Sequence, residues 1–477
     1  MKKVILTGLS LIVSCTLYAQ SSTEVLNALE KKSSYYGTIS KKIWDYAEVG
    51  YQETKSSTLL QDELKKEGFS IKAGVAGIPT AFIATYGSGK PVISILAEYD
   101  ALPGLAQQAV PERSPIEGQR AGHACGHHLF GTGSTAAAIA VKDWLKQSGK
   151  SGTIQLIGTP AEEGGSGKVY MVRDGIFDNT DVVLHWHPGD ENAANPSSSL
   201  ANISGKFRFY GVSAHAAAAP DRGRSALDGV EAMNDMVNMM REHIPSDTRV
   251  HYIITKGGEA PNVVPDFAEV YYYARHKDRT VLQNVWKRIT KAAEGAALGT
   301  ETRMELEVIG GVYNLLSVET LASVMHKNLQ TVGGFTYTDE EKKFADKISE
   351  TFGASFGSIT RPGSNQIAPF SAASLLGSAS TDVGDVSWVV PTVGLTAATW
   401  VPGTAAHSWQ AVAAGGTSIG VKGMMVAAKT IALTAIDLYN DPALIKKAHQ
   451  EWEEARGKNF HYEALLGNRK PALDYRK

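Results

Sequence analysis

The chain has 477 residues, of which 43% are hydrophobic and 20% charged, and its formal net charge is -2. This length exceeds what one hydrophobic core sustains, so we expect two or three domains. The near-neutral charge balance lacks the basic surface typical of proteins that bind nucleic acid or anionic membranes. The sequence also contains no repeat or low-complexity tract, which argues against a solenoid.

The N-terminus has the features of an export signal. Two lysines, Lys2 and Lys3, precede the apolar run Val4–Val13. That run is far shorter than the ~20 residues of a membrane-spanning helix. It is typical of a secretory signal peptide cleaved after Ala19, which predicts an exported, periplasmic protein without a membrane span. The letters "IVSC" leave an alternative open, in which Cys15 is lipidated and anchors the protein.

Strands and helices alternate through the first part of the predicted mature chain. Apolar residues at helical spacing predict helices over residues 25–49 and 56–69. Predicted strands and helices then follow at 81–87 (strand), 91–100 (strand), 133–149 (helix), 152–165 (strand) and 180–190 (strand). The helix at 133–149 is expected to start just after a cluster of histidines. This alternation predicts an α/β domain with a mostly parallel sheet covered by helices on both faces.

The pattern changes near Ile203. Strands are predicted at 203–211, 249–258, 267–276 and 302–311, with helices at 224–240 and 281–298. Four strands with two helices predict an α+β domain over 203–316, inserted into a first domain made of 20–202 and 317–477. In the resumed part, residues 390–397 predict a strand. The segment 338–375, a charged helix followed by a Gly/Ser-rich loop, is expected to be a surface insertion of unknown role.

Four loops carry the residue types that bind metal ions. They are "HACGHH" at 123–128, "PAEEGG" at 160–165, "HWHP" at 185–188 and "GTAAHSWQ" at 403–410. In open α/β sheets, ligands bind in loops beyond the carboxyl ends of the strands. The loops offer one thiolate, several imidazoles and two carboxylates, a set that suits zinc, manganese or cobalt rather than calcium. The set exceeds four ligands, which favours two ions acting on one water.

Two of these loops suggest specific chemistry. Cys125 precedes a predicted helix, whose dipole lowers a thiol pKa, and a deprotonated sulfur can bridge two cations. The alternative is a buried, unreactive cysteine. Of the adjacent Glu162 and Glu163, one can bind metal while the other carries protons. The alternative for this pair is an exposed acidic turn.

The motifs "IWDYAEVGYQET", "LAEYDALPG", "HACGHH", "TPAEEGG", "GVSAHAAAAP", "APNVVPD" and "AHSWQ" occur in this order. Together they resemble the M20 metallopeptidase family, in particular its amidohydrolase branch and the aminobenzoyl-glutamate utilization group within that branch. The resemblance spans nearly the whole mature chain. It implies two divalent metal ions, manganese or zinc, and an inserted dimerisation (lid) domain of ferredoxin-like topology. It also implies hydrolysis of N-acyl or N-aroyl amino acids such as p-aminobenzoyl-glutamate, by a homodimer or a heterodimer with a homologous subunit.

The resemblance also assigns roles to residues. It implies metal ligation by Cys125, His127, Glu163, His187 and His407, and a general base at Glu162. His187 is preferred over His185 because the family's ligand lies six residues beyond Asp181. His123 and His128 are expected to be neighbours of the site rather than ligands. Asp100 matches an aspartate that orients a metal-binding histidine.

In the inserted domain, His215 matches a histidine that reaches the partner subunit's active site and stabilises the oxyanion. Asn262 and Arg275 match residues that bind the substrate carboxylate. Without the family pattern, each of the three has an ordinary interpretation as a turn or strand-end residue. The chain departs from the family at His128, where an aspartate is usual, and in the segment "TDVGDVSW", which leaves the roles of Asp382 and Asp385 open.

Three other functions remain open at this point. A dipeptidase or carboxypeptidase would share every one of these catalytic residues. A thiol hydrolase would use Cys125 as its nucleophile. A non-catalytic binding protein would keep the fold without the reaction.

Overall fold

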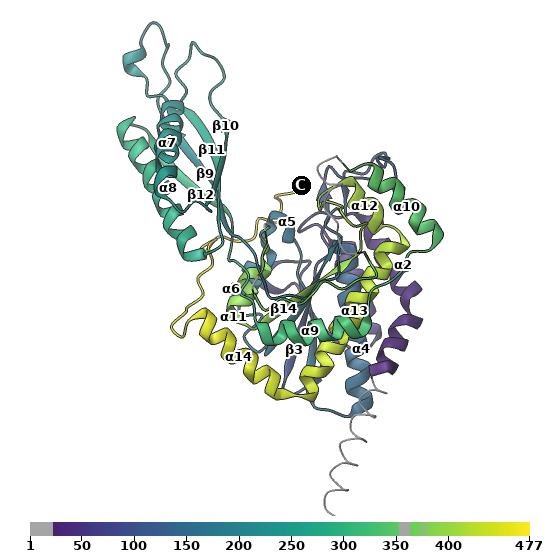
Figure 1. Cartoon of the computed structure of the whole chain (residues 1–477). Helices are drawn as coiled ribbons and strands as arrows, with labels where there is room; N and C mark the ends of the chain where they lie inside the picture. Colours follow the sequence, from purple (N-terminus) through teal and green to yellow (C-terminus); the bar gives the residue numbers. More distant parts are fainter. Residues whose placement is uncertain (1–21, 353–362, 374, 378) are drawn as a thin grey trace, which may run out of the picture.

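The computed structural model describes residues 22–352, 363–373, 375–377 and 379–477. The predicted signal peptide and Cys15 lie outside the described residues, as does part of the predicted insertion at 338–375. Two main sheets organise the described chain, and each is packed against helices (Figure 1).

The larger sheet has six strands in the order β1-β2-β6-β3-β7-β14. Their bounds are Ser70–Ala73 (β1), Phe82–Ser88 (β2), Gly152–Gly158 (β6), Val92–Ala97 (β3), Val182–Gly189 (β7) and Thr392–Ala398 (β14). Strands β6, β3, β7 and β14 run parallel, whereas β2 is antiparallel to both β1 and β6. This arrangement confirms the predicted mostly parallel sheet. The continuous apolar run in β3 follows from burial on both faces.

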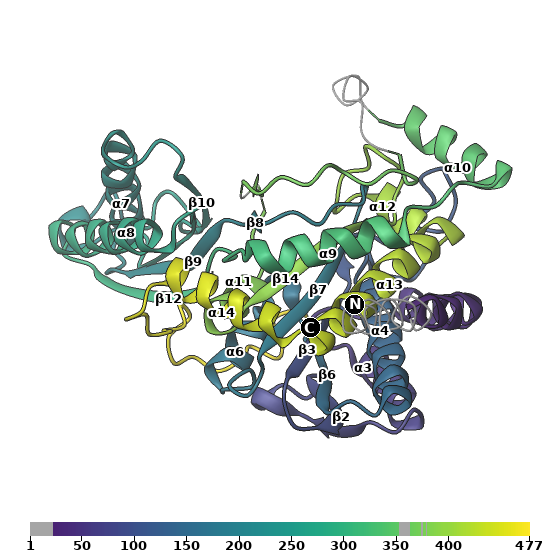
Figure 2. The same cartoon turned by 60° about the horizontal axis from the view of Figure 1, so that its bottom comes forward.

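Helices cover this sheet on both sides (Figures 1 and 2). Helices α4 (His127–Ser148) and α13 (Ser418–Asn440) pack on each other and on the strands, flanked by α2 (Ser33–Tyr46), α3 (Thr54–Lys66) and α9 (Glu319–Val332). Helices α6 (Gly167–Arg173) and α11 (Val383–Val389) pack together, and α14 (Pro442–Arg456) packs on α9. The short helix α12 (Trp409–Gly415) precedes α13.

Helix α13 is long and apolar enough to cross a membrane by length and composition alone. It is the one such helix in the part of the chain that the structure describes. Because 83% of its apolar window is buried inside the protein, it is explained as a core helix.

Two helices have bounds that differ from those predicted. The helix predicted over 25–49 is interrupted at Lys32 and ends at Tyr46, because Ala47 adopts a left-handed conformation with φ 44°. Helix α4 begins at His127, inside the histidine cluster, rather than after it as predicted. Its first turn can include these histidines because they are buried, and burial outweighs their modest helix propensity.

The second sheet has four strands in the order β10-β11-β9-β12. The elements are β9 (Ala201–Tyr210), α7 (Ala226–Met240), β10 (Arg249–Lys256), β11 (Phe267–His276), α8 (Arg279–Gly299) and β12 (Arg303–Val312). All neighbouring strands are antiparallel, which together with this order gives the ferredoxin-like topology that the resemblance implied. Both helices pack on the sheet around a separate apolar core that includes Phe207, Phe209 and Trp286.

The charged helix of the predicted insertion is α10 (Asp339–Glu350). It begins with a capping box between Thr338 and Glu341. Its apolar residues Ala345 and Ile348 join a small cluster with Val401, in the segment that leads to His407. The helix is therefore anchored beside one of the predicted metal-binding loops.

Candidate metal centre and active site

The carboxyl ends of four parallel strands bring the predicted metal ligands together. Glu163 follows β6, His187 lies near the end of β7, and His407 follows β14. Cys125 and His127 lie at the start of α4, after the segment that follows β3. Both histidines at 185 and 187 lie in β7, inside the strand predicted over 180–190, rather than in the loop beyond it where the ligand motif was placed.

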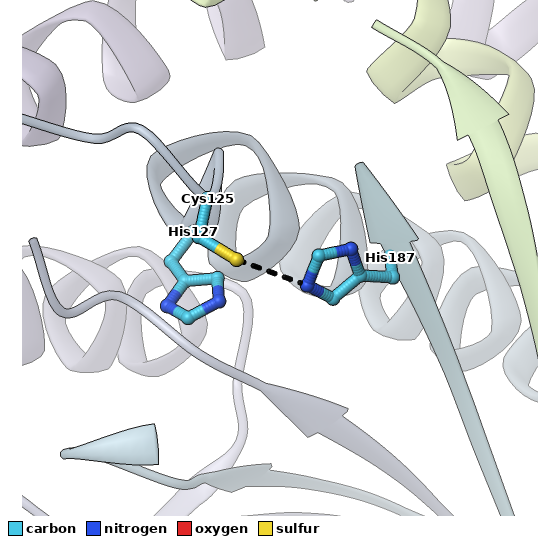
Figure 3. A group of neighbouring side chains, drawn as sticks. All are labelled: Cys125, His127 and His187. Carbon is cyan, nitrogen blue, oxygen red and sulfur yellow. Dashed lines mark hydrogen bonds between the residues drawn. The ribbon is translucent and has the colours of Figure 1, made fainter. Parts of the chain in front are cut away.

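The five predicted ligands form two groups that share one residue. Ligand atoms of Cys125, His127 and His187 lie within 4.8 Å of one another, as do those of Cys125, Glu163 and His407. Figure 3 shows the first group, in which Cys125 Sγ lies 3.3 Å from His187 Nε2. In the second, His407 Nε2 lies 2.9 Å from Glu163 Oε1. A sulfur common to both groups is the arrangement expected of a ligand that bridges two cations.

Two buried polar atoms indicate whether a cation fits between the ligand groups. In the described part of the chain, His127 Nε2 and Glu163 Oε1 are buried and form no hydrogen bond of good geometry; each lies only against another group of the site, Glu98 Oε2 at 3.1 Å and His407 Nε2 at 2.9 Å. An unpaired buried polar atom is costly, and a bound cation removes that cost. One thiol, three imidazoles and a carboxylate also suit a transition metal. The residues present therefore fit a pair of divalent metal ions.

Asp100 holds two of the ligands in place, as the sequence predicted for one of them. Its Oδ1 lies 2.8 Å from His127 Nδ1, and its Oδ2 accepts a hydrogen bond of 2.9 Å from the Glu163 N–H. Burial opposes ionisation of Asp100, but His127 and the Glu163 N–H outweigh it and lower the pKa of Asp100. The ionised carboxylate thereby directs His127 Nε2 toward the cysteine.

The thiol of Cys125 is buried among the other ligands. Burial raises its pKa, whereas the neighbouring His127 lowers it. Gly126, next to it, has φ 77°, and a Cβ at this position would lie 2.6 Å from Pro188 Cβ. Only glycine allows this close approach to the end of β7. The sulfur of Cys125 belongs to both groups of ligand atoms, which favours a metal ligand over the nucleophile of a thiol hydrolase.

The carboxylate pair lies on a turn of unusual backbone conformation. Ala161 and Ser166 have φ 58° and 56°, in the left-handed region. Glu163 belongs to the ligand group of Cys125 and His407, whereas Glu162 belongs to a third group with His127 and Glu98. Burial and the neighbouring Glu163 raise the pKa of Glu162 well above its usual range. A carboxyl group with a raised pKa can act as a general acid as well as a base.

The other histidines of the cluster point elsewhere. His123 Nε2 lies 3.1 Å from the Ile43 carbonyl oxygen, and His128 Nε2 lies 3.0 Å from that of Gly415. His185 packs over β14, where a Cβ at Gly394 would lie 2.4 Å from its ring. None of the three is in a group of ligand atoms, so the structure favours His187 over His185.

The three predicted residues of the second sheet do not lie together. His215 and Asn262 belong to loops after β9 and β10, where the Ala216 N–H donates to the Asn262 carbonyl oxygen. Arg275 is paired with Asn202 at the opposite end of the sheet. His215 is exposed, and its Nδ1 accepts hydrogen bonds from the N–H groups of residues 217 and 218. Within one chain, these loops extend away from the larger sheet (Figure 1).

Sequence reasoning missed a buried charged group behind the ligands. Lys168 Nζ lies 2.7 Å from Glu98 Oε1 and 2.8 Å from Asp382 Oδ1, and all three residues are buried. Glu98 Oε2 in turn lies 3.1 Å from His127 Nε2. Asp385, whose role was also open, accepts hydrogen bonds from Tyr313 N–H and Tyr462 O–H. The one signal in the sequence was an acidic residue directly after the apolar strand β3.

Comparison with known proteins agrees with this site. A family model described as "Peptidase dimerisation domain" matches residues 201–301. The chain is 42% identical over 451 residues to the B subunit of the p-aminobenzoyl-glutamate hydrolase of Escherichia coli strain K12, covering 90% of this chain and 94% of that one. It is 30% identical to the Xaa-Arg dipeptidase of Mus musculus, covering 89% and 90%. It is 28% identical to the A subunit of the same Escherichia coli hydrolase, covering 60% and 76%.

Solved structures show the same fold. A putative aminohydrolase of methicillin-resistant Staphylococcus aureus matches with a TM-score of 0.63 and 16% identity, covering 87% of this chain and 99% of that one. A dinuclear metal-binding peptidase of the M20 family from Bacillus subtilis matches with a TM-score of 0.57 and 16% identity, covering 86% and 99%. Together with the donor geometry, these likenesses show that the chain belongs to the M20 family of metal-dependent hydrolases, which act on amide bonds.

Proposed function

We propose that the chain hydrolyses the amide bond of N-acyl or N-aroyl amino acids, with p-aminobenzoyl-glutamate as the first compound to test. The observation that carries this proposal is the shared cysteine, with two groups of ligand atoms beside a carboxyl group of raised pKa. The name of the 42% identical relative supports the choice of substrate. The soluble, exported form with the signal peptide removed is proposed for the mature protein, and the lipid anchor at Cys15 is its alternative.

The ligand groups would hold two divalent cations, manganese or zinc, through Cys125, His127, Glu163, His187 and His407. When bound, such cations lower the pKa of water and polarise a carbonyl group. Asp100 fixes the tautomer of His127, because its carboxylate accepts a hydrogen bond from Nδ1–H and leaves Nε2 free to ligate.

Glu162 carries the proton in this proposal. Its carboxylate removes a proton from the attacking water and returns it to the leaving amine. The raised pKa helps this carboxyl group to hold the proton that it returns to the leaving amine. The partner's His215 would donate a hydrogen bond to the oxyanion, and Asn262 and Arg275 would bind the substrate carboxylate.

The second sheet supports assembly with another copy or a homologue. Strand β10 is at the sheet edge, and its Ile253 and Ile254 are exposed. Helix α7 exposes Met236 and Met239. An exposed apolar edge strand is a site where another chain pairs. We propose a dimer through this surface, formed either by two copies or with a homologous chain, since the Escherichia coli hydrolase has two related kinds of subunit.

Two neighbouring substitutions test the reaction. Glu162→Gln should lower turnover of p-aminobenzoyl-glutamate by several orders of magnitude while the metal content stays near that of the unchanged protein. Glu163→Gln should lower both the turnover and the metal content. Turnover is measured as release of p-aminobenzoate after loading with manganese, zinc or cobalt, and metal content by elemental analysis. A Glu162→Gln protein with near-normal turnover would rule out this role. Hydrolysis of dipeptides, measured as release of free amino acids, would identify a peptidase.

A further inference from the structure

A cavity lies directly beside the metal ligand His407. It has a volume of about 560 Å³ and is bordered by His407, Ser408 and Trp409 on one side. The segment 104–120, which connects β4 (Leu102–Pro103) to β5 (Ala121–Gly122), provides the other side. This volume is within the range of pockets that bind small molecules.

The segment 104–120 is held in a defined conformation. Gln107 is fully buried, and its Nε2 donates hydrogen bonds to the carbonyl oxygens of Gln108 and Glu112. Its Oε1 accepts a hydrogen bond from the Ser114 N–H. The segment is therefore preorganised, so binding a ligand there does not require it to order first.

Hydrogen-bond donors line the cavity. Arg113 and Arg120 are exposed to it, and within the described part of the chain neither forms an ion pair with a carboxylate. The two acidic residues of the segment, Glu112 and Glu117, are not among the lining residues. A guanidinium group binds a carboxylate with two parallel hydrogen bonds, and two of them favour an anionic ligand.

We propose that this cavity binds a second carboxylate of the substrate, so that the enzyme prefers N-acyl amino acids with an acidic side chain, glutamate or aspartate. The inference rests on the proposed function, because the cavity opens beside a ligand of the proposed metal centre. Leu105, Pro115 and Trp409 supply apolar contacts for the methylene groups or ring next to the charge.

The test compares N-acyl-glutamate with N-acyl-glutamine carrying the same acyl group. Because a hydrogen bond to a charged group contributes more than a neutral one, the Arg113→Gln, Arg120→Gln double variant should raise KM for the glutamate compound about tenfold. KM for the glutamine compound and kcat for both should stay unchanged, and lysine at both positions should restore part of the loss.

The matched control changes Glu112 and Glu117 to glutamine in the same segment. An unchanged preference in the arginine double variant, or an equal change in this control, would overturn the proposal. Binding of the same two compounds is also measured by calorimetry in the Glu162→Gln background. If the enzyme hydrolyses neither compound, the proposed function fails. The ratio of the dissociation constants of the glutamate and glutamine compounds still decides for or against the carboxylate site.

A different observation concerns the C-terminal segment 457–477, which follows α14. It runs from the larger domain to the second sheet, where Arg469 donates to the Ile309 carbonyl oxygen over 3.0 Å. It then returns to the turn of the two glutamates, and the C-terminus lies beside α5 (Glu162–Gly165) in Figure 1.

The last residues of this segment hold the backbone of a proposed metal ligand. Tyr475 O–H donates to the Glu163 carbonyl oxygen over 2.9 Å, and Arg476 Nη2 donates to the same atom over 2.8 Å. Gly50 makes room for this contact, because a Cβ there would lie 2.2 Å from the Tyr475 hydroxyl oxygen. The turn itself contains two left-handed residues, Ala161 and Ser166, so it needs external contacts to persist.

We infer that Tyr475 and Arg476 are positioning residues, which orient the Glu163 carboxylate toward Cys125 and His407 from the far end of the chain. Partners that orient a metal ligand typically change metal affinity 10- to 100-fold when removed. The Tyr475→Phe, Arg476→Gln double variant should therefore bind the metal ion at the group of Cys125, Glu163 and His407 about tenfold more weakly. Arg476→Lys should retain most of this affinity.

Metal affinity is measured by competition with a chelator and by the absorption spectrum of bound cobalt, both independent of turnover. Tyr170→Phe is the matched control, because its hydroxyl donates to the Lys470 carbonyl oxygen of the same segment over 3.4 Å without touching Glu163. An unchanged affinity and cobalt spectrum in the double variant, or an equal loss in Tyr170→Phe, would overturn the inference.

Discussion

Asp100→Asn should weaken metal binding without removing any ligand. In the structure this carboxylate contacts His127 Nδ1 with one oxygen and accepts the Glu163 N–H with the other. The asparagine side chain has a single acceptor oxygen and no charge, so it can keep at most one of these contacts as an acceptor. Its amide nitrogen would face either the Glu163 N–H or the imidazole N–H, and two donors cannot form a hydrogen bond.

The size of the effect follows from the contact that is lost. A hydrogen bond to a charged group contributes about 1.5–3 kcal/mol. Each 1.4 kcal/mol corresponds to about a tenfold change in an equilibrium constant, so we expect a loss of about 10- to 100-fold in metal affinity. Turnover at saturating metal should fall less than in Glu162→Gln, because the general base remains.

The assay titrates metal-free protein with manganese or zinc in competition with a coloured chelator. Asp385→Asn is a matched control. Its carboxylate is also fully buried in the larger domain and also accepts a backbone N–H, here that of Tyr313, but it does not contact the ligands. Wild-type affinity in Asp100→Asn, or an equal loss in Asp385→Asn, would refute the reasoning.

Three further substitutions test other parts of the structure. His187→Ala should lower the metal content measured by elemental analysis, whereas His185→Ala should keep it, since only His187 lies near Cys125; equal metal contents would contradict the assignment. Lys168→Met should lower the free energy of unfolding in urea by about 3–5 kcal/mol, because two buried carboxylates lose their cation; an unchanged midpoint would contradict this. Burial raises the pKa of Asp385 to about 7, so the contribution of this group to the free energy of unfolding should fall as pH rises from about 4 to 7, and Asp385→Asn should lack that fall; parallel profiles of the two proteins would contradict the assignment.

The direction of this pH dependence follows from the pKa of Asp385 in the unfolded and the folded chain. In the unfolded chain its pKa is near 4, and in the folded chain it is about 7. The folded state therefore binds the proton more tightly, and the stabilisation is complete below pH 4. It is lost as pH rises through 7, because the ionised carboxylate is then buried.

Local patterns in the sequence determined the elements and the types of ligand. The apolar run within 91–100 predicts a buried strand, which is β3 (Val92–Ala97), and the four strands and two helices predicted over 203–316 form the second sheet and the helices packed on it. Ligand residues directly after predicted strands converge, because parallel strands bring their carboxyl ends to one edge of the sheet. These features depend on residues close together in the chain, so spacing and composition reveal them.

The tertiary structure decided what depends on distant residues. Burial, which no local pattern measures, raises the pKa of Asp385 to about 7. His185 and His187 lie two residues apart in β7, so the local pattern alone does not separate them; the resemblance favoured His187, and its Nε2 lies 3.3 Å from Cys125 Sγ. The contact of Tyr475 with Glu163 joins residues more than three hundred positions apart. Such contacts are set by how whole elements pack, so only the folded chain reveals them.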